Sequence, residues 1–133
     1  TYTDTLKSVA KSLPALMRAQ KVGKRAMRAG MDFKGYDDTV SCIKSELSEL
    51  EEAIKSGNTD SIEDELGDLL FSCVNTARHL NIDAEEALNK AIEKFIKRFE
   101  ETEKIIRLKG IDMKSLSIDE IDDYWREAKR KLI

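Results

Sequence analysis

The spacing of apolar residues predicts an almost entirely helical chain. Between residues 43 and 80, leucine, isoleucine and cysteine recur three or four positions apart, which places them on one side of a helix. The first stripe consists of Ile43, Leu47, Leu50 and Ile54, and the second of Ile62, Leu66, Leu69, Cys73 and Leu80. Only the turn-rich stretch 55–60 separates them, so we expect two antiparallel helices whose stripes face each other.

The chain before residue 43 predicts one further helix and a loop. Proline is well tolerated in a first helical turn and glycine is a natural stop, so we expect a helix from about Pro14 to Gly30. Leu6 and Val9 lie in helical phase before it and indicate one or two extra turns. Residues 31–38 are expected to form a loop that leads into the first stripe.

After residue 80 the sequence predicts a long helix and a short final one. Each is opened by the spacing of a capping box, Asp83 with Glu86 and Ser117 with Glu120. The chain has one Pro and six Gly in 133 residues, which favours helix throughout. We therefore predict an all-α fold, a helical bundle of about four to five helices, in a single domain, residues 1–133.

A pair of carboxylates accompanies each stripe at the same spacing. Glu46 and Glu49 lie roughly 60° and 120° to one side of the first stripe, and Glu65 and Asp68 take the same offsets on the second. An approximate two-fold axis relates antiparallel helices, so the four carboxylates are expected to converge. Like charges held that close favour a hard divalent cation among them, and Mg²⁺ is the predicted ion, with Mn²⁺ as the alternative. The competing interpretation is a solvated acidic face, because 26 residues are acidic.

Basic and aromatic residues suggest binding roles. Lys94 and Arg98, four positions apart, share one flank of the long helix and can hold a polyphosphate, although a solvated basic edge is the alternative. Phe33, in the expected loop, can stack on a base or cap a core. Residues 1–30 are strongly basic although the whole chain has a net charge of −3, so a basic arm faces an acidic body.

Other features narrow the class of protein. No stretch approaches the length of a membrane span and no apolar N-terminal segment resembles a secretion signal, so we expect a cytoplasmic protein. The two cysteines suit reduced core positions, and a single histidine without a CxxC motif argues against zinc. The chain begins with Thr1, which indicates a fragment or a processed chain.

Four stretches resemble the MazG nucleoside triphosphate pyrophosphohydrolases. They are KSELSEL at 44–50, ELGDLLF at 65–71, VNTARHL at 74–80 and KFIKRF at 94–99. The match covers nearly the whole chain. LPAL at 13–16 and WREAK at 125–129 resemble the C-terminal of the two tandem MazG domains found in longer members.

The resemblance implies an all-α homodimer that cleaves a nucleoside triphosphate to the monophosphate and pyrophosphate. Mg²⁺ would be bound by the four carboxylates named above. Lys94 and Arg98 match the family residues that hold the phosphate chain, and Asn75 lies in the segment beside the metal. Glu49 is the predicted base for the attacking water, because it lies further from the packing stripe than Glu46. Lys21 and Arg25 of the basic helix are expected to help stabilise the leaving pyrophosphate.

Three positions depart from the family pattern. Ser45 stands where a second Glu is usual, and Ile92 where an Asn is common. Phe33 replaces the Trp of a G-F-D-W segment, so the base preference is open.

Three other interpretations compete with a broad-specificity or house-cleaning pyrophosphohydrolase. The first is a non-enzymatic helical module whose basic arm binds nucleic acid or a protein partner, although the arm has little aromatic interleaving and the chain is net negative. The second is a di-iron bundle, which needs Glu-x-x-His pairs, whereas Thr76 precedes His79 at that spacing. The third is a relative specialised for one nucleotide.

Overall fold

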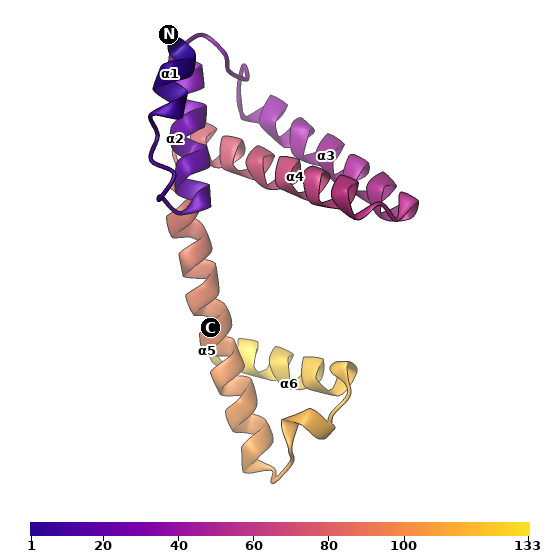
Figure 1. The fold of residues 1–133 in the computed structure, drawn as a ribbon. Coiled ribbons are helices and arrows are strands. Elements are labelled where there is room, and N and C mark those ends of the chain that lie inside the picture. The colour runs from indigo at the N-terminus through magenta and orange to yellow at the C-terminus, as the bar shows by residue number, and fades with distance from the viewer. The chain divides into compact units, whose positions relative to one another are not determined.

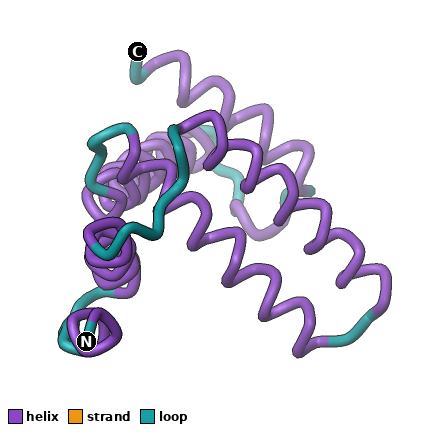
Figure 2. Tube along the Cα trace, turned by 90° about the horizontal axis from the view of Figure 1, so that it is seen from above, coloured by secondary structure: helices purple, strands orange, loops and turns teal.

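The computed structural model describes residues 1–133 and contains only helices and loops (Figures 1 and 2). The helices are α1 (Tyr2–Lys7), α2 (Ala15–Arg28), α3 (Tyr36–Ser56), α4 (Thr59–His79), α5 (Ala84–Leu108), the 3-10 turn η1 (Met113–Ser115) and α6 (Ile118–Lys131). The predicted all-α class is confirmed. None of these helices has both the length and the apolar content needed to cross a bilayer.

The chain divides into two compact units, Thr1–Ala87 and Leu88–Ile133. The first contains α1 to α4 and the start of α5, and the second contains the rest of α5, η1 and α6. The organisation of the whole chain as one domain stays a prediction.

The helix ends lie close to where the sequence signals place them. Gly57 ends α3 in the left-handed region at φ 72°, which a residue with a Cβ adopts only with strain, and Asn58 then caps α4 by accepting a hydrogen bond from the Ser61 N–H. The backbone N–H of Glu86 donates to Asp83 Oδ1 over 3.0 Å at the start of α5. One boundary differs from expectation, because α3 already begins at Tyr36 inside the predicted loop.

Helices α3 and α4 run antiparallel and side by side, as predicted (Figure 1). They meet, however, through a line of small and polar side chains. Cys42 Sγ lies 3.3 Å from Ser72 Oγ across the contact, and Ala53 is buried on the same line of α3. Glu46 lies within roughly 40° of Cys42 and Ala53 around the helix. The contact therefore centres on the carboxylate positions.

The prediction that the two apolar stripes face each other is wrong. Leu47 and Leu66 are each 45% exposed, and Ile54 is 56% exposed. On each helix the stripe lies roughly 40–100° from Glu46 or Glu65 around the axis. The separation of packed helices depends on the side chains at the contact, and here the small residues lie at the contact while the larger ones remain on one flank. We call this exposed surface of Leu47, Ile54, Leu66 and Cys73 the apolar flank.

Helix α2 packs against α4 near its C-terminal end (Figure 1). Val74, near that end of α4, is only 2% exposed. The Gln20 side chain donates to the Ile82 carbonyl and accepts from the Ala84 N–H, both over 2.9 Å. Gln20 thereby fixes the connection between α4 and α5 against α2.

In the second unit, α6 packs against the C-terminal half of α5. Ile106 of α5 and Ala128 of α6 are fully buried. The rings of Phe95 and Trp125 have centroids 5.2 Å apart, and Lys109 Nζ lies 4.9 Å from the centre of the Tyr124 ring. Apolar burial and aromatic contacts hold this unit together.

Replacing Ile106 with Ala should lower the free energy of unfolding by about 2–5 kcal/mol, because it leaves a cavity in a fully buried site. Urea denaturation followed by circular dichroism measures the change. Leu108→Ala is the matched control, because Leu108 is 79% exposed on the same helix. Equal effects of the two substitutions would contradict the packing described.

Candidate metal centre

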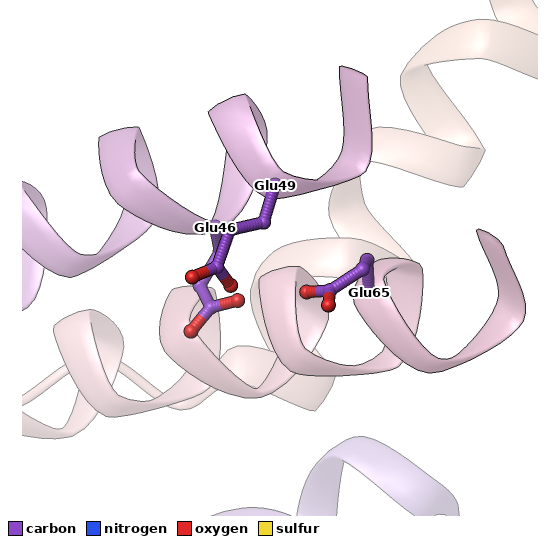
Figure 3. A group of neighbouring side chains, drawn as sticks. All are labelled: Glu46, Glu49 and Glu65. Carbon is purple, nitrogen blue, oxygen red and sulfur yellow. The ribbon is translucent and has the colours of Figure 1, made fainter. Parts of the chain in front are cut away.

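Three glutamate side chains meet between α3 and α4. One carboxylate oxygen from each of Glu46, Glu49 and Glu65 lies within 4.8 Å of the other two. Figure 3 shows the carboxylates of Glu46 and Glu49 beside each other on α3, with that of Glu65 facing them from α4. The convergence predicted from the matched offsets is therefore present for these three residues.

A second group of carboxylates shares Glu65. Oxygens of Asp64, Glu65 and Asp68 also lie within 4.8 Å of one another. All four predicted ligands thus belong to two groups joined at Glu65. Asp64 was missed by the sequence analysis, which considered only the positions repeated on both helices. Its position directly before Glu65 in the sequence could have indicated that Asp64 belongs to the same site. We call the residues Glu46, Glu49, Asp64, Glu65 and Asp68 the carboxylate cluster.

Two carboxylate oxygens of the cluster have no partner in the protein. Glu46 Oε2 and Glu65 Oε2 are both buried and have no hydrogen-bond partner. A buried polar atom without a partner costs free energy, and the cost is greater for a charged atom.

The ionisation of the cluster reflects this crowding. Hydrogen bonding between the carboxyl groups of Glu46 and Glu49 is the main cause that raises the pKa of Glu46 from 4.5 to about 7, with desolvation and neighbouring charges adding to it. For Glu65 desolvation is the main cause of a raised pKa, followed by the influence of Glu49 and Asp68. A raised pKa means that each group binds a proton more readily, and a cation among the carboxylates would compete with that proton.

The chemistry of these side chains fits a hard divalent cation. Every available donor is a carboxylate oxygen, which Mg²⁺ and similar ions prefer, and nitrogen or sulfur ligands are absent from both groups. A cation would supply the partner that Glu46 Oε2 and Glu65 Oε2 lack. The cluster is therefore a candidate metal centre.

A second polar cluster joins the loop before α3 to the end of α4. Arg78 donates to both carboxylate oxygens of Asp32, over 2.7 and 3.2 Å, and to Asn75 Oδ1 over 3.3 Å. His79 Nε2 lies 2.9 Å from Asp32 Oδ1. Hydrogen bonding from Arg78 is the main cause that holds the pKa of Asp32 well below its usual range. We call Asp32, Asn75, Arg78 and His79 the Arg78 cluster.

The sequence analysis found only part of the Arg78 cluster. Asn75 was a candidate site residue, whereas His79 was considered only in the di-iron alternative. Asp32 and Arg78 were missed, although an acidic residue in the loop and an Arg in VNTARHL were visible as possible partners. Phe33, the candidate base-stacking residue, packs its ring edge against His79 with centroids 6.2 Å apart.

The predicted phosphate-binding cations lie in two places. Lys21 is exposed on α2, whereas the Arg25 guanidinium donates to the Thr5 carbonyl and to Ser8 Oγ and so ties α1 to α2. Lys94 and Arg98 belong to the second unit, one turn apart on α5, where Lys94 is exposed and Arg98 is half-buried. Their roles stay predictions.

Fold and site together define a class of protein, an all-α domain with a carboxylate cluster between two antiparallel helices. The family model described as the MazG nucleotide pyrophosphohydrolase domain matches residues 34–102, which include both helices and the whole cluster. The chain belongs to this family.

Curated relatives extend the similarity beyond that segment. The chain is 40% identical over 130 residues to an Escherichia coli K12 protein named nucleoside triphosphate pyrophosphohydrolase, covering 96% of this chain and 49% of the relative. It is 41% identical over 117 residues to a Thermotoga maritima protein named nucleoside triphosphate pyrophosphohydrolase/pyrophosphatase MazG, covering 88% and 45%. An uncharacterised Bacillus subtilis protein, YabN, is 35% identical over 125 residues, which cover 93% of this chain and 26% of the relative. The chain spans about half the length of the first two relatives.

The metal-free protein should lose stability as the pH rises from about 4.5 to about 7, because the pKa of Glu46 is higher in the folded chain than its ordinary value. A group with a raised pKa stabilises the fold fully at a pH below its pKa in the unfolded chain. This stabilisation is lost as the pH rises to the pKa of the group in the folded chain. Melting temperatures in EDTA, measured from pH 4.5 to 7.5, should therefore fall more steeply for the wild type than for Glu46→Gln.

The control variant is Glu51→Gln, which changes an exposed residue of α3 and should follow the wild-type profile. Mg²⁺ at pH 7.5 should raise the melting temperature of the wild type and of this control more than that of Glu46→Gln. Parallel pH profiles for the wild type and Glu46→Gln would contradict a raised pKa of Glu46 in the folded chain.

Proposed function

We propose that the chain hydrolyses nucleoside triphosphates in a Mg²⁺-dependent reaction, in which water and the triphosphate yield a nucleoside monophosphate and pyrophosphate. The enzyme either accepts many different nucleoside triphosphates or removes non-standard nucleotides from the nucleotide pool. The observation that carries the proposal is the carboxylate cluster, in which two buried oxygens, Glu46 Oε2 and Glu65 Oε2, have no partner. Membership of the MazG family and the names of two relatives support the same reaction.

Each part of the proposed site has a role that its chemistry suits. Glu46, Glu49, Glu65 and Asp68 hold the metal, and Mn²⁺ can replace Mg²⁺ with the same oxygen ligands. When bound, the metal supplies positive charge that offsets the phosphate oxygens. Glu49 is the proposed base for the attacking water, because its side chain is exposed while it reaches the enclosed oxygens of its neighbours.

The remaining candidates bind the substrate. Lys94 and Arg98 hold the triphosphate as charge-assisted donors, and Lys21 adds positive charge. Arg25 contributes mainly by long-range attraction, because its guanidinium is engaged by α1. The nucleoside end is the proposed partner of Asn75 and Phe33.

Glu65→Gln should abolish metal-dependent turnover, with a loss of at least about 100-fold, because even residues behind a metal ligand cost 10–100-fold when changed. Chromatography of the products, after incubation with each common NTP and dNTP in Mg²⁺ or in EDTA, measures the reaction. Glu51→Gln, at an exposed position outside both carboxylate groups, should retain wild-type turnover.

The products decide between the alternatives. Monophosphate and pyrophosphate in Mg²⁺ alone are the expected result. Diphosphate and orthophosphate would show that a different bond is cleaved. No turnover of any nucleotide by the folded protein would contradict the proposal and leave the basic binding module as the better account.

The second part of the proposal is a homodimer. The apolar flank exposes Leu47, Ile54, Leu66 and Cys73 along one side of the α3–α4 pair. Exposed apolar side chains gathered on adjacent helices are typical of a protein interface, and a second copy of the same surface is the proposed partner.

Light scattering should give twice the chain mass of 15.1 kDa for the wild type. Leu47→Glu combined with Leu66→Glu should give a monomer, because burying two unpaired carboxylates in the interface is costly. The matched control is Tyr2→Glu, at a residue that is 69% exposed on α1. A monomeric wild type, or a dimer that survives the double change, would exclude this interface.

A further inference from the structure

Asn75 presents an unused pair of hydrogen-bond donors in an otherwise buried place. The residue is only 9% exposed, yet its one side-chain hydrogen bond is the one its Oδ1 accepts from Arg78. Its amide N–H groups have no partner in the chain. The amide nitrogen is not one of the buried atoms that lack a partner, so it is open to solvent and can donate to an acceptor that a ligand supplies.

Arg78 determines which way the amide faces. An arginine side chain can only donate, so it can pair with the oxygen of Asn75 and not with the nitrogen. If the oxygen and nitrogen of the amide exchanged places, the amide N–H groups would face the N–H groups of the guanidinium. Neither set of donors would then have an acceptor there. The contact over 3.3 Å therefore directs the two amide N–H groups away from Arg78.

Arg78 itself is held by groups from a different part of the chain. Its guanidinium forms a two-point pair with Asp32, and His79 bonds the same carboxylate. The backbone of α2 approaches both side chains closely at Gly23. A Cβ added at this glycine would lie only 3.1 Å from Arg78 Nε and from Asn75 Oδ1. The position of Asn75 thus depends on α2, α4 and the loop before α3 together.

One atom of the Arg78 guanidinium is left without a partner. Arg78 Nε is buried and has no hydrogen-bond partner. A buried polar atom without a partner costs free energy, and the two-point pair with Asp32 nevertheless fixes the guanidinium in this position.

Asn75 also lies on the side of α4 that carries a metal ligand. Asp68 and Asn75 are seven positions apart, which places them on the same side of the helix and roughly 10 Å apart along its axis. Resting on the proposed function, we propose that Arg78, held by Asp32, is a positioning residue that turns the Asn75 amide toward an acceptor atom of the bound nucleotide. Arg78 itself does not contact the nucleotide.

A double-mutant cycle between Arg78→Lys and Asn75→Ala tests this inference. Lysine keeps the charge but lacks the planar fork that bonds Asp32 and Asn75 together. In the wild-type background Arg78→Lys should raise KM about tenfold, which is the effect of losing about 1.4 kcal/mol of binding, with kcat changed less than about twofold. In the Asn75→Ala background the same change should alter KM less than about twofold.

Two further variants check that the result does not depend on the Arg78→Lys substitution alone. Asp32→Asn removes the charge that holds Arg78 and should raise KM in the same Asn75-dependent way. Arg107→Lys, at an exposed residue of α5, is the matched control and should leave KM unchanged. Melting temperatures show whether each variant is folded, and the Kd of a non-hydrolysable α,β-methylene triphosphate repeats the cycle without turnover.

The outcomes separate this inference from the proposed function. An active wild type in which Arg78→Lys raises KM equally in both backgrounds, or not at all, overturns the positioning role alone. A folded wild type that neither hydrolyses nor binds nucleotides overturns the proposed function and the inference with it. A coupled loss in KM and Kd, absent from Arg107→Lys, supports both.

Discussion

Mutual repulsion between carboxylates at the α3–α4 contact is the constraint on which the rest of the first unit depends. The helices approach each other through small side chains such as Cys42, Ser72 and Ala53, and the same line of contact carries Glu46 and Glu65. Two of their oxygens are therefore enclosed without a partner. A protein retains such an arrangement when something positive completes it, and the oxygen-only donors suit a divalent cation.

The surroundings of the cluster follow from this close approach. Because small residues take the contact, the large apolar residues of both helices are displaced to one side and form the apolar flank. Near the C-terminal end of α4, helix α2 and the loop before α3 hold Arg78 through Gly23 and Asp32. The carboxylate cluster and the apolar flank thus lie on different sides of the same helix pair, and the Arg78 cluster lies further along α4.

Much of this arrangement could be predicted from the sequence. The matched spacing of Glu46, Glu49, Glu65 and Asp68 predicted their convergence, and local signals such as Gly57 and the capping boxes set the helix ends. The contact face was predicted wrongly, because apolar periodicity marks a surface to be buried but not what buries it. Asp32 and Arg78 are 46 positions apart, and their pairing depends on the path of the loop, which periodicity does not encode.

The most direct test of the carboxylate cluster is isothermal titration calorimetry of Mg²⁺ into the metal-free protein at pH 7, in two buffers that differ in ionisation enthalpy. The raised pKa values of Glu46 and Glu65 mean that a cation should bind with release of protons, so the measured enthalpy should differ between the buffers. Both the binding and the difference should be lost in Glu65→Gln. Absence of Mg²⁺ binding, or binding with the same enthalpy in both buffers and in the variant, would contradict a metal centre at this contact.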